Sequence, residues 1–354
     1  MNWTISRFAA AAVALLLLAG LAAPAWADGA VMFVYHRFGD SRYPSTNIAV
    51  EVFAAQLEYL KHNNYTVLTA GEVARRLRSG VELPPRCVSL TVDDGYTTFL
   101  TGAMPLLRRY HYPATLFVAS DSVGRHGYLS WEQLRSLEQE GVEIGNHSAA
   151  HPYFVDDQVQ HPDDWRRHAR ADIERAQQAF TRHLGHKVAL FAYPYGEYSP
   201  ALAKLVRKLG FAAAFAQQSG VVDTGADLYA LPRFPMGGGY ATLQGFSSKA
   251  RMRRLPVTDV EPLSPLISRQ DPPELTFTLA NSLIDTGSLR CYVQGQNAVS
   301  VELSTDGRYH VRAHQPLAGR RNKYTVTGRG RDGKHWYWFS HLWVHPRKQV
   351  AEKR

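Results

Sequence analysis

Cysteine is scarce in this chain of 354 residues, where it occurs only as Cys87 and Cys291. A fold held together by several disulfides is therefore excluded, and a chain of this length buries a substantial core without such crosslinks. The pattern favours two buried free thiols, although one disulfide between these cysteines stays open in an oxidising compartment. Internal repeats are also absent, and no low-complexity tract follows residue 27. A repeat architecture is therefore excluded.

Charged residues are almost absent from the first 27 positions, where Arg7 precedes an apolar run over residues 9–23. Ala25 and Ala27 then form a small-x-small cleavage pattern, so we predict a cleaved signal peptide over residues 1–27. The alternative is a retained membrane anchor, because the uncharged stretch approaches the ~20 residues that span a bilayer. No cysteine follows the cleavage pattern, so a lipoprotein anchor is not indicated. We expect the mature protein in the periplasm or outside the cell.

Acidic residues are fewer than basic ones, 31 against 40, which gives a formal net charge of +9. Removal of the signal peptide with Arg7 leaves +8 (9 − 1). No nucleic-acid-binding motif accompanies this charge, so nucleic acid is not an expected partner. A basic exported protein is expected to contact anionic envelope polymers or membrane surfaces instead.

Strand-like and helix-like segments alternate along the first two thirds of the chain. The strand-like segments cover residues 31–35, 65–68, 88–92, 114–118, 142–145, 189–193 and 211–215. Between two of them, Ser130 and Gln133 form a capping box that predicts the start of a helix. Such a β-α succession predicts an α/β fold with a mainly parallel sheet or barrel.

Two neighbouring acids, Asp93 and Asp94, end the strand-like segment over residues 88–92. Gly95 follows them and lets the backbone turn, which brings both carboxylates toward one pocket. An acidic loop after a strand is the better interpretation of this pair alone. A second cluster favours a metal site over an acidic loop, because His147 and His151 are four residues apart. Two imidazoles at this spacing and one carboxylate suit a three-ligand metal site with an open position.

These residues lie in motifs that resemble those of the polysaccharide deacetylases, carbohydrate esterase family four. The motifs are TVDDGY, HSAAH and FAYPYGEY, and the resemblance spans residues 31–234. The opening FVYHRFGD resembles a subgroup that deacetylates the poly-N-acetylglucosamine of biofilms. The resemblance implies a distorted (β/α) barrel of about seven strands with its site at the carboxyl rim.

The resemblance also implies roles for five residues. Asp93 would be the general base, and Asp94, His147 and His151 would bind a divalent metal, for which zinc is the expected ion. The backbone N–H of Tyr195 would hold the oxyanion.

The chain departs from the family pattern at two places. Leu190 stands where relatives often have an arginine, and Arg233 is the candidate to orient Asp93 instead. Arg233 is also a candidate substrate-binding residue. No histidine occurs in residues 228–240, where relatives often carry the general acid, so the proton donor is unassigned. His36 follows the first predicted strand and is a candidate pocket and substrate-binding residue, with an ordinary loop histidine as the equal alternative.

The composition changes near residue 255. Repeated prolines predict a linker over residues 256–274 that follows a catalytic domain over 28–255. Short strand-like segments with turn signals then predict a small all-β sandwich domain over residues 275–346, before a basic tail over 347–354. We expect the sandwich to assist substrate docking or assembly.

These observations predict a metal-dependent N-deacetylase that acts on N-acetylglucosamine residues of an exported polysaccharide. A peptidoglycan or chitooligosaccharide deacetylase is the alternative enzyme. A non-catalytic carbohydrate-binding protein on a degenerate deacetylase fold is the alternative from another class. Expected partners are the N-acetylated polysaccharide itself and proteins of the envelope or of polysaccharide export.

Overall fold

The computed structural model describes residues 29–267, 271–280 and 283–347 of the chain. The predicted signal peptide over 1–27 and nearly all of the predicted basic tail lie outside these ranges. In the described ranges, every helix is too short or too polar to cross a membrane.

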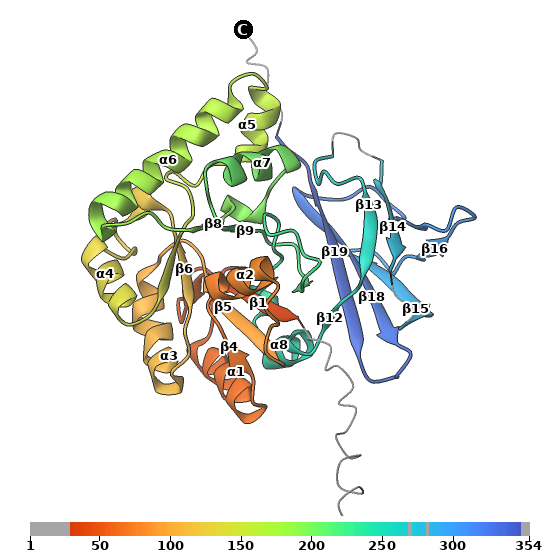
Figure 1. Ribbon diagram of the computed structural model, residues 1–354, viewed down its shortest axis with the longest axis horizontal. Helices are drawn as coiled ribbons and strands as arrows, with labels where there is room; N and C mark the ends of the chain where they lie inside the picture. The colour runs from red at the N-terminus through yellow and green to blue at the C-terminus, as the bar shows by residue number, and fades with distance from the viewer. Residues whose placement is uncertain (1–28, 268–270, 281–282, 348–354) are drawn as a thin grey trace, which may run out of the picture.

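A curled, mainly parallel sheet organises the first part of the molecule (Figure 1). Its strands, in spatial order, are β10 (Val221–Val222), β1 (Ala30–Tyr35), β5 (Cys87–Val92), β6 (Thr115–Val118), β7 (Glu143–Asn146), β8 (Leu190–Ala192) and β9 (Ala213–Phe215). Two short strands join it, β11 (Phe234–Pro235) beside β1 and β4 (Thr66–Val67) beside β5. Only the pairing of β1 with β10 is antiparallel. The predicted distorted (β/α) barrel is therefore confirmed.

Most of the strands are parallel because helices connect successive strands and return the chain to the same end of the sheet, which leaves the strands buried. All six residues of β1 and all six of β5 are buried. The helices are α1 (Val50–His62), α2 (Ala70–Ser79), α3 (Met104–Tyr110), α4 (Trp131–Gln139), α5 (Phe154–Gln160), α6 (Trp165–Leu184), α7 (Pro200–Lys208) and α8 (Leu243–Ala250). Helix α4 begins at the predicted capping box, in which Ser130 and Gln133 each accept a backbone N–H of the other.

Shorter elements connect these strands and helices. They are a π-helical turn over Phe99–Ala103, 3₁₀ turns over Ser120–Ser122, Pro194–Gly196 and Gly238–Tyr240, and the paired strands β2 (Arg37–Phe38) and β3 (Asn47–Ile48). The turn over Pro194–Gly196 follows β8 and carries a predicted site residue.

Two four-stranded sheets form the second part of the molecule, drawn in cyan to blue in Figure 1. One has the order β12 (Arg253–Arg254), β19 (Trp336–Val344), β18 (Arg321–Gly330) and β15 (Ile284–Val293). The other has the order β13 (Val257–Glu261), β14 (Glu274–Leu279), β17 (Tyr309–Arg312) and β16 (Glu302–Leu303). Phe277 and Val311 of one sheet share a hydrophobic core with Val326 and Trp343 of the other. This is the predicted all-β sandwich.

The proline-rich stretch differs from its prediction in one respect. We predicted a linker over 256–274, but Val257–Glu261 within it forms β13 and pairs with β14. The strand is tolerated between Pro256 and Pro262 because it lies at the edge of its sheet, where a missing N–H breaks no ladder. The division into a catalytic domain, a linker and a β-domain remains a proposal. Strands β12 and β13 precede the predicted start of the β-domain at residue 275 but belong to its two sheets.

The two cysteines are free and buried, as the sequence favours. Cys87 opens β5 in the barrel, whereas Cys291 belongs to the core of the sandwich. Burial raises the pKa of each thiol to about 12, so neither is reactive at neutral pH.

The sandwich is fastened to the barrel near the carboxyl ends of the barrel strands. Arg320 Nε and Nη2 lie 2.8 and 2.6 Å from the two carboxylate oxygens of Glu197, and Arg320 Nη1 lies 2.9 Å from Asp156. Trp338 of β19 packs on Phe234 of β11, with ring centroids 5.2 Å apart. The start of β18 therefore lies close to the turn that follows β8.

Candidate metal and catalytic site

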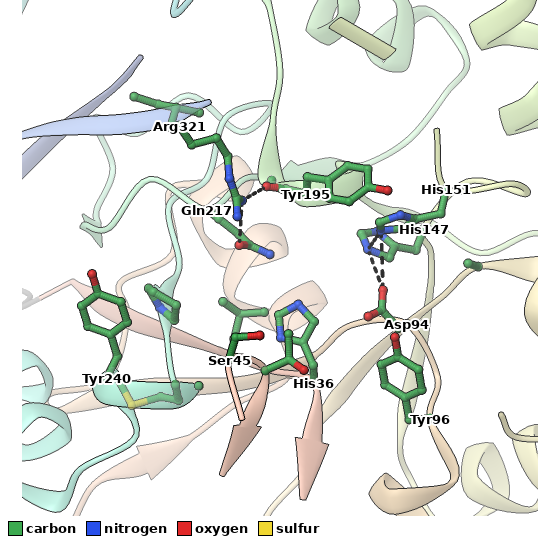
Figure 2. A pocket seen from close by; sticks show the side chains of 18 of the residues that line it. His36, Ser45, Asp94, Tyr96, His147, His151, Tyr195, Gln217, Tyr240 and Arg321 are labelled. Atoms are coloured by element: carbon green, nitrogen blue, oxygen red, sulfur yellow. Dashed lines mark hydrogen bonds and ion pairs between the residues drawn. The ribbon is translucent and has the colours of Figure 1, made fainter. Parts of the chain in front are cut away.

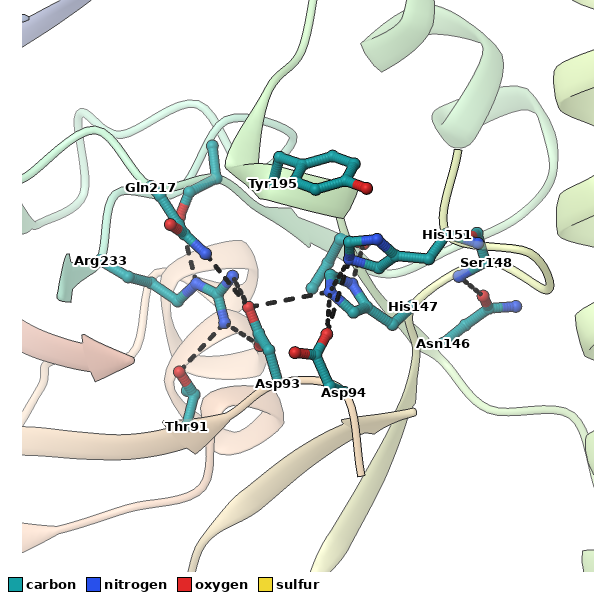
Figure 3. Close-up of polar contacts among 12 residues, drawn as sticks. Thr91, Asp93, Asp94, Asn146, His147, Ser148, His151, Tyr195, Gln217 and Arg233 are labelled. Carbon is teal, nitrogen blue, oxygen red and sulfur yellow. Dashed lines mark hydrogen bonds and ion pairs between the residues drawn. The ribbon is translucent and has the colours of Figure 1, made fainter. Parts of the chain in front are cut away.

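Strand β5 ends in a backbone turn that separates its two acids. The Asp93 N–H still donates to the Tyr35 carbonyl in the sheet. Asp94 and Gly95 then both have positive φ, 77° and 82°. We predicted the turn at Gly95, but the left-handed backbone begins one residue earlier. Because of it, both side chains face the same pocket instead of opposite faces of the sheet (Figure 3).

Asp93 is fully buried and is paired with Arg233, which is also fully buried. The guanidinium Nη1 and Nη2 lie 2.7 and 2.8 Å from the two carboxylate oxygens. The same guanidinium donates to Thr91 Oγ1 and to the Ala216 carbonyl, each at 3.1 Å. Burial raises the pKa of Asp93, but the charges of Arg233 and His147 outweigh burial and hold that pKa below its usual value. Asp93 is therefore ionised at neutral pH.

The loop after β7 holds His147 and His151 in place through its own hydrogen bonds (Figure 3). Asn146 Oδ1 accepts the Ser148 N–H at 2.6 Å, and Ser148 Oγ accepts the His151 N–H at 2.9 Å. The buried Asp172 of α6 accepts the N–H groups of the two alanines in between, at 2.9 and 3.1 Å. The small residues of this motif thus shape the loop, and the two histidines face the pocket.

Three side-chain atoms converge on one point between the two loops. Asp94 Oδ1 lies 3.5 Å from His147 Nε2 and 3.5 Å from His151 Nε2, and the two nitrogens are 3.1 Å apart. Ligand atoms of a tetrahedral ion with bonds of ~2.0–2.1 Å are separated by ~3.3 Å. His147 Nδ1 lies 2.8 Å from the Ala192 carbonyl, which leaves the Nε2 lone pair directed at the site. The three residues therefore form a candidate site for one divalent metal ion.

The protonation states of Asp94 and His151 suit metal binding. Burial, followed by the nearby charge of His147, lowers the pKa of His151 to about 4, so this imidazole is neutral at neutral pH. Burial opposes the charge of Asp94, but a hydrogen bond to His147 and the positive charges around it hold the pKa of Asp94 well below its usual value. A neutral imidazole and an ionised carboxylate are the forms that bind a metal. Burial lowers the pKa of His147, but the charges of Asp93 and Asp94 outweigh burial and raise that pKa above its usual value, so a metal ion would have to displace a proton from His147.

Tyr195 occupies the turn after β8 with a positive φ of 59°. Its ring stacks on Tyr153 with centroids 3.7 Å apart and contacts the edge of His151 at 4.4 Å. Gly196 is required next, because a Cβ at this position would lie 2.3 Å from Gln217 Cβ. The turn therefore places the Tyr195 ring against His151, one of the metal candidates.

Strained backbone is concentrated at this pocket. Eight non-glycine residues in the described ranges have positive φ, and four of them, Asp94, Ser148, His151 and Tyr195, surround the candidate metal site. Such conformations cost of order 1–3 kcal/mol each and persist where the surrounding structure fixes a functional geometry. This clustering supports a functional role for the pocket independently of the sequence motifs.

A cavity of about 650 Å³ opens over these residues (Figure 2). Five of the seven predicted site residues line this cavity, namely His36, Tyr195 and the three metal candidates. A sixth, Asp93, adjoins it and lies 4.0 Å from His147 Nε2. Arg233 stands behind Asp93 and is the seventh.

Sequence reasoning missed several residues of the cavity. Gln217 donates to Asp93 Oδ2 at 3.4 Å, and Arg321 and Lys323 reach the cavity from β18 of the sandwich. Tyr153, which supports the Tyr195 ring, was also missed. The position of Gln217, two residues after the end of β9, was an available signal, whereas no local pattern marks the two residues of β18.

Comparisons with known proteins agree with this geometry. Residues 80–214 match the family model described as "Polysaccharide deacetylase". A poly-beta-1,6-N-acetyl-D-glucosamine N-deacetylase of Staphylococcus epidermidis is 26% identical over 202 residues, which cover 55% of this chain and 70% of that protein. A protein of the same name from Escherichia coli K12 is 23% identical over 244 residues, which cover 58% of this chain but only 36% of that longer protein.

Among solved structures, IcaB from Ammonifex degensii is similar with a TM-score of 0.56 and 28% identity. The similarity covers 63% of this chain and 97% of that structure. The family model, these relatives and the barrel with its aspartate pair and histidine pair point to the same conclusion. The chain therefore carries a domain that is similar to those of the polysaccharide deacetylase family.

Proposed function

We propose that this protein is a metal-dependent N-deacetylase that removes acetyl groups from N-acetylglucosamine residues of an exported polysaccharide. The observation that carries the proposal is the convergence of Asp94, His147 and His151 beside the buried ion pair of Asp93 and Arg233, all at one cavity. The names of the relatives support the substrate class, because they are poly-beta-1,6-N-acetyl-D-glucosamine N-deacetylases.

The metal that we propose for the site is zinc. Two imidazoles, one carboxylate and an open fourth position are a frequent donor set of catalytic zinc sites. A divalent ion held there would polarise the amide carbonyl and make a water molecule more acidic.

Asp93 is suited to be the general base. Its carboxylate is ionised, lies 4.0 Å from His147 Nε2, and is held by Arg233 so that it cannot turn away from the pocket. We propose that Asp93 takes the proton of the attacking water, while the Tyr195 N–H donates to the oxyanion that forms on the acetyl carbonyl.

His36 is the proton donor that we propose for the leaving amine. The histidines that line the cavity are His36, His147 and His151, and the last two have the ligand positions. His36 therefore replaces the late histidine that the sequence lacks. Its side chain is among those that line the cavity (Figure 2).

We further propose that a signal peptide over residues 1–27 exports the protein to the periplasm or outside the cell. The basic charge of the chain supports contact with anionic envelope components, and proteins of polysaccharide export are proposed partners.

Acetate release from a panel of N-acetylated glycans tests the function. The panel contains poly-β-1,6-N-acetylglucosamine, chitin oligomers and peptidoglycan fragments, each incubated with zinc-loaded and with chelated protein. We expect zinc-dependent release that is fastest on the β-1,6 polymer. Faster release from another glycan would reassign the substrate, and binding of glycans without any acetate release would favour a carbohydrate-binding protein.

A further inference from the structure

Strand β18 of the sandwich forms one wall of the catalytic cavity. Arg321 and Lys323 are two residues apart on this strand and both line the cavity, as side chains on one face of a strand do. Arg321 Nη1 donates to the Tyr195 carbonyl and lies 3.5 Å from Gln217 Oε1 (Figure 2). Lys323 Nζ donates to Ser219 Oγ at 2.9 Å. This wall of the cavity is therefore cationic, and it contacts the turn over Pro194–Gly196, which carries the proposed oxyanion donor Tyr195.

No acidic side chain among the described residues of the cavity offsets this wall. Asp94 is the one acid that lines the cavity, and it belongs to the candidate metal site. Asp93 is paired with Arg233. Glu197 lies 3.9 Å from Arg321, does not line the cavity, and shares Arg320 with Asp156. The charge of Arg321 is thus partly balanced from behind the wall, whereas no carboxylate among the described lining residues balances Lys323.

The charge on Lys323 is retained near neutral pH. Burial, followed by the charges of Arg321 and Lys249, lowers the pKa of Lys323 to about 8. The group is therefore mostly protonated at pH 7. A partly buried charge is screened by salt less than an exposed one, so it acts over the short distances within a cavity.

We propose that Arg321 and Lys323 make the catalytic cavity select neutral, acetylated sugar units and disfavour units with a free amine. The inference rests on the proposed function, because each deacetylation converts a neutral N-acetylglucosamine into a cationic glucosamine. A unit that has already reacted would be repelled from positions next to the wall. The enzyme would therefore remove acetyl groups at dispersed positions rather than in consecutive blocks.

Two pentamers of β-1,6-linked sugar test the proposal. One is fully N-acetylated, and the other has a single central acetyl group between free amines. We expect kcat/KM of the wild type to be about tenfold lower on the second pentamer at low salt, as two nearby like charges predict. Arg321→Gln with Lys323→Gln should reduce the difference to about twofold, while Arg321→Lys should retain it. Arg329→Gln removes a cation at the far end of the same strand and should also retain it.

Calorimetric binding of the fully deacetylated pentamer gives a readout that needs no turnover. We expect it to bind the double variant more tightly than the wild type and Arg329→Gln, at low salt. Equal kcat/KM of the wild type on both pentamers, or an unchanged preference in the double variant, would overturn the proposal. If the wild type releases no acetate from either pentamer, binding of the two pentamers is compared directly. Selective binding of the acetylated one would then keep the charge selection and refute the proposed deacetylase.

Discussion

The barrel and the sandwich contribute to the cavity in different ways. The barrel supplies the proposed metal ligands, base and proton donor from loops at the ends of its strands, where buried partners and positive φ angles hold them. The sandwich supplies Arg320 from the residue before β18, and it supplies Arg321 and Lys323 from β18 itself, a regular strand in which no non-glycine residue has a positive φ. We infer that the barrel supplies the residues that take part in the reaction. The sandwich holds the turn that contains Tyr195 and places cationic side chains on one wall of the cavity. The following predictions test this division.

Loss of a proposed metal ligand in the barrel should have the largest effect. Asp94→Ala and His147→Ala each remove one of three ligands, so we expect bound zinc and acetate release to fall together to the level of chelated wild type. Metal analysis and acetate assays measure both. A variant that keeps full zinc and full activity would contradict the assigned site.

Asp93→Asn should separate metal binding from turnover. The amide keeps the size of the side chain but cannot take a proton, so we expect kcat to fall by ~10² to 10⁴, the usual range for a general base. Zinc content should stay near that of the wild type, because Asp94 and both histidines remain. Near-normal turnover of this variant would show that the base lies elsewhere.

His36→Gln should lower kcat by ~10² or more if His36 donates the proton to the leaving amine. Zinc content and KM should change little. His186→Gln removes an exposed histidine that pairs with Glu138 and does not line the cavity, and it serves as the matched control. If the kcat of His36→Gln is close to that of the control, His36 is not the proton donor and has at most a role in substrate binding.

The sandwich is tested through the ion pair that fastens it. Arg320→Ala leaves Glu197 and Asp156 buried without their partner, so we expect a loss of about 3 kcal/mol in the free energy of unfolding. We also expect kcat to fall, because Arg320 lies 4.1 Å over the Tyr153 ring that supports Tyr195. Urea unfolding and acetate assays measure the two effects, and Arg329→Ala should change the stability by less than ~0.5 kcal/mol.

The stability of the protein should also fall in acid because of His341 in β19. This histidine is buried, and burial lowers its pKa from 6.5 to about 4. Since the unfolded chain binds the proton more readily, the contribution to stability is present above pH 6.5 and is lost as the pH falls toward 4. We expect a loss of about 2 kcal/mol between pH 8 and pH 5 that is absent in His341→Gln. Equal pH dependence of the two proteins would contradict this assignment.

The sequence by itself determined the α/β barrel, the all-β sandwich and the candidate metal residues. Alternating apolar segments specify buried parallel strands, and parallel strands bring their carboxyl ends to one rim. The acids after β5 and the histidines after β7 therefore had to lie near one another. The apolar patterns and the acid and histidine motifs each span only a few residues, so they can be recognised from the sequence alone.

Only the tertiary structure decided the geometry of the rest of the site. The family resemblance suggested that Arg233 orients Asp93, but the bidentate pairing across 140 residues of chain is seen only in the structure, and nothing in the sequence indicated that Arg321 reaches Tyr195 across 126 residues. No periodicity or turn signal specifies such pairings, because they depend on how the whole sheet curls and where a second domain docks. The left-handed backbone of Asp94, His151 and Tyr195 likewise has no local signature, since tertiary contacts hold these non-glycine residues in a conformation that they would otherwise avoid.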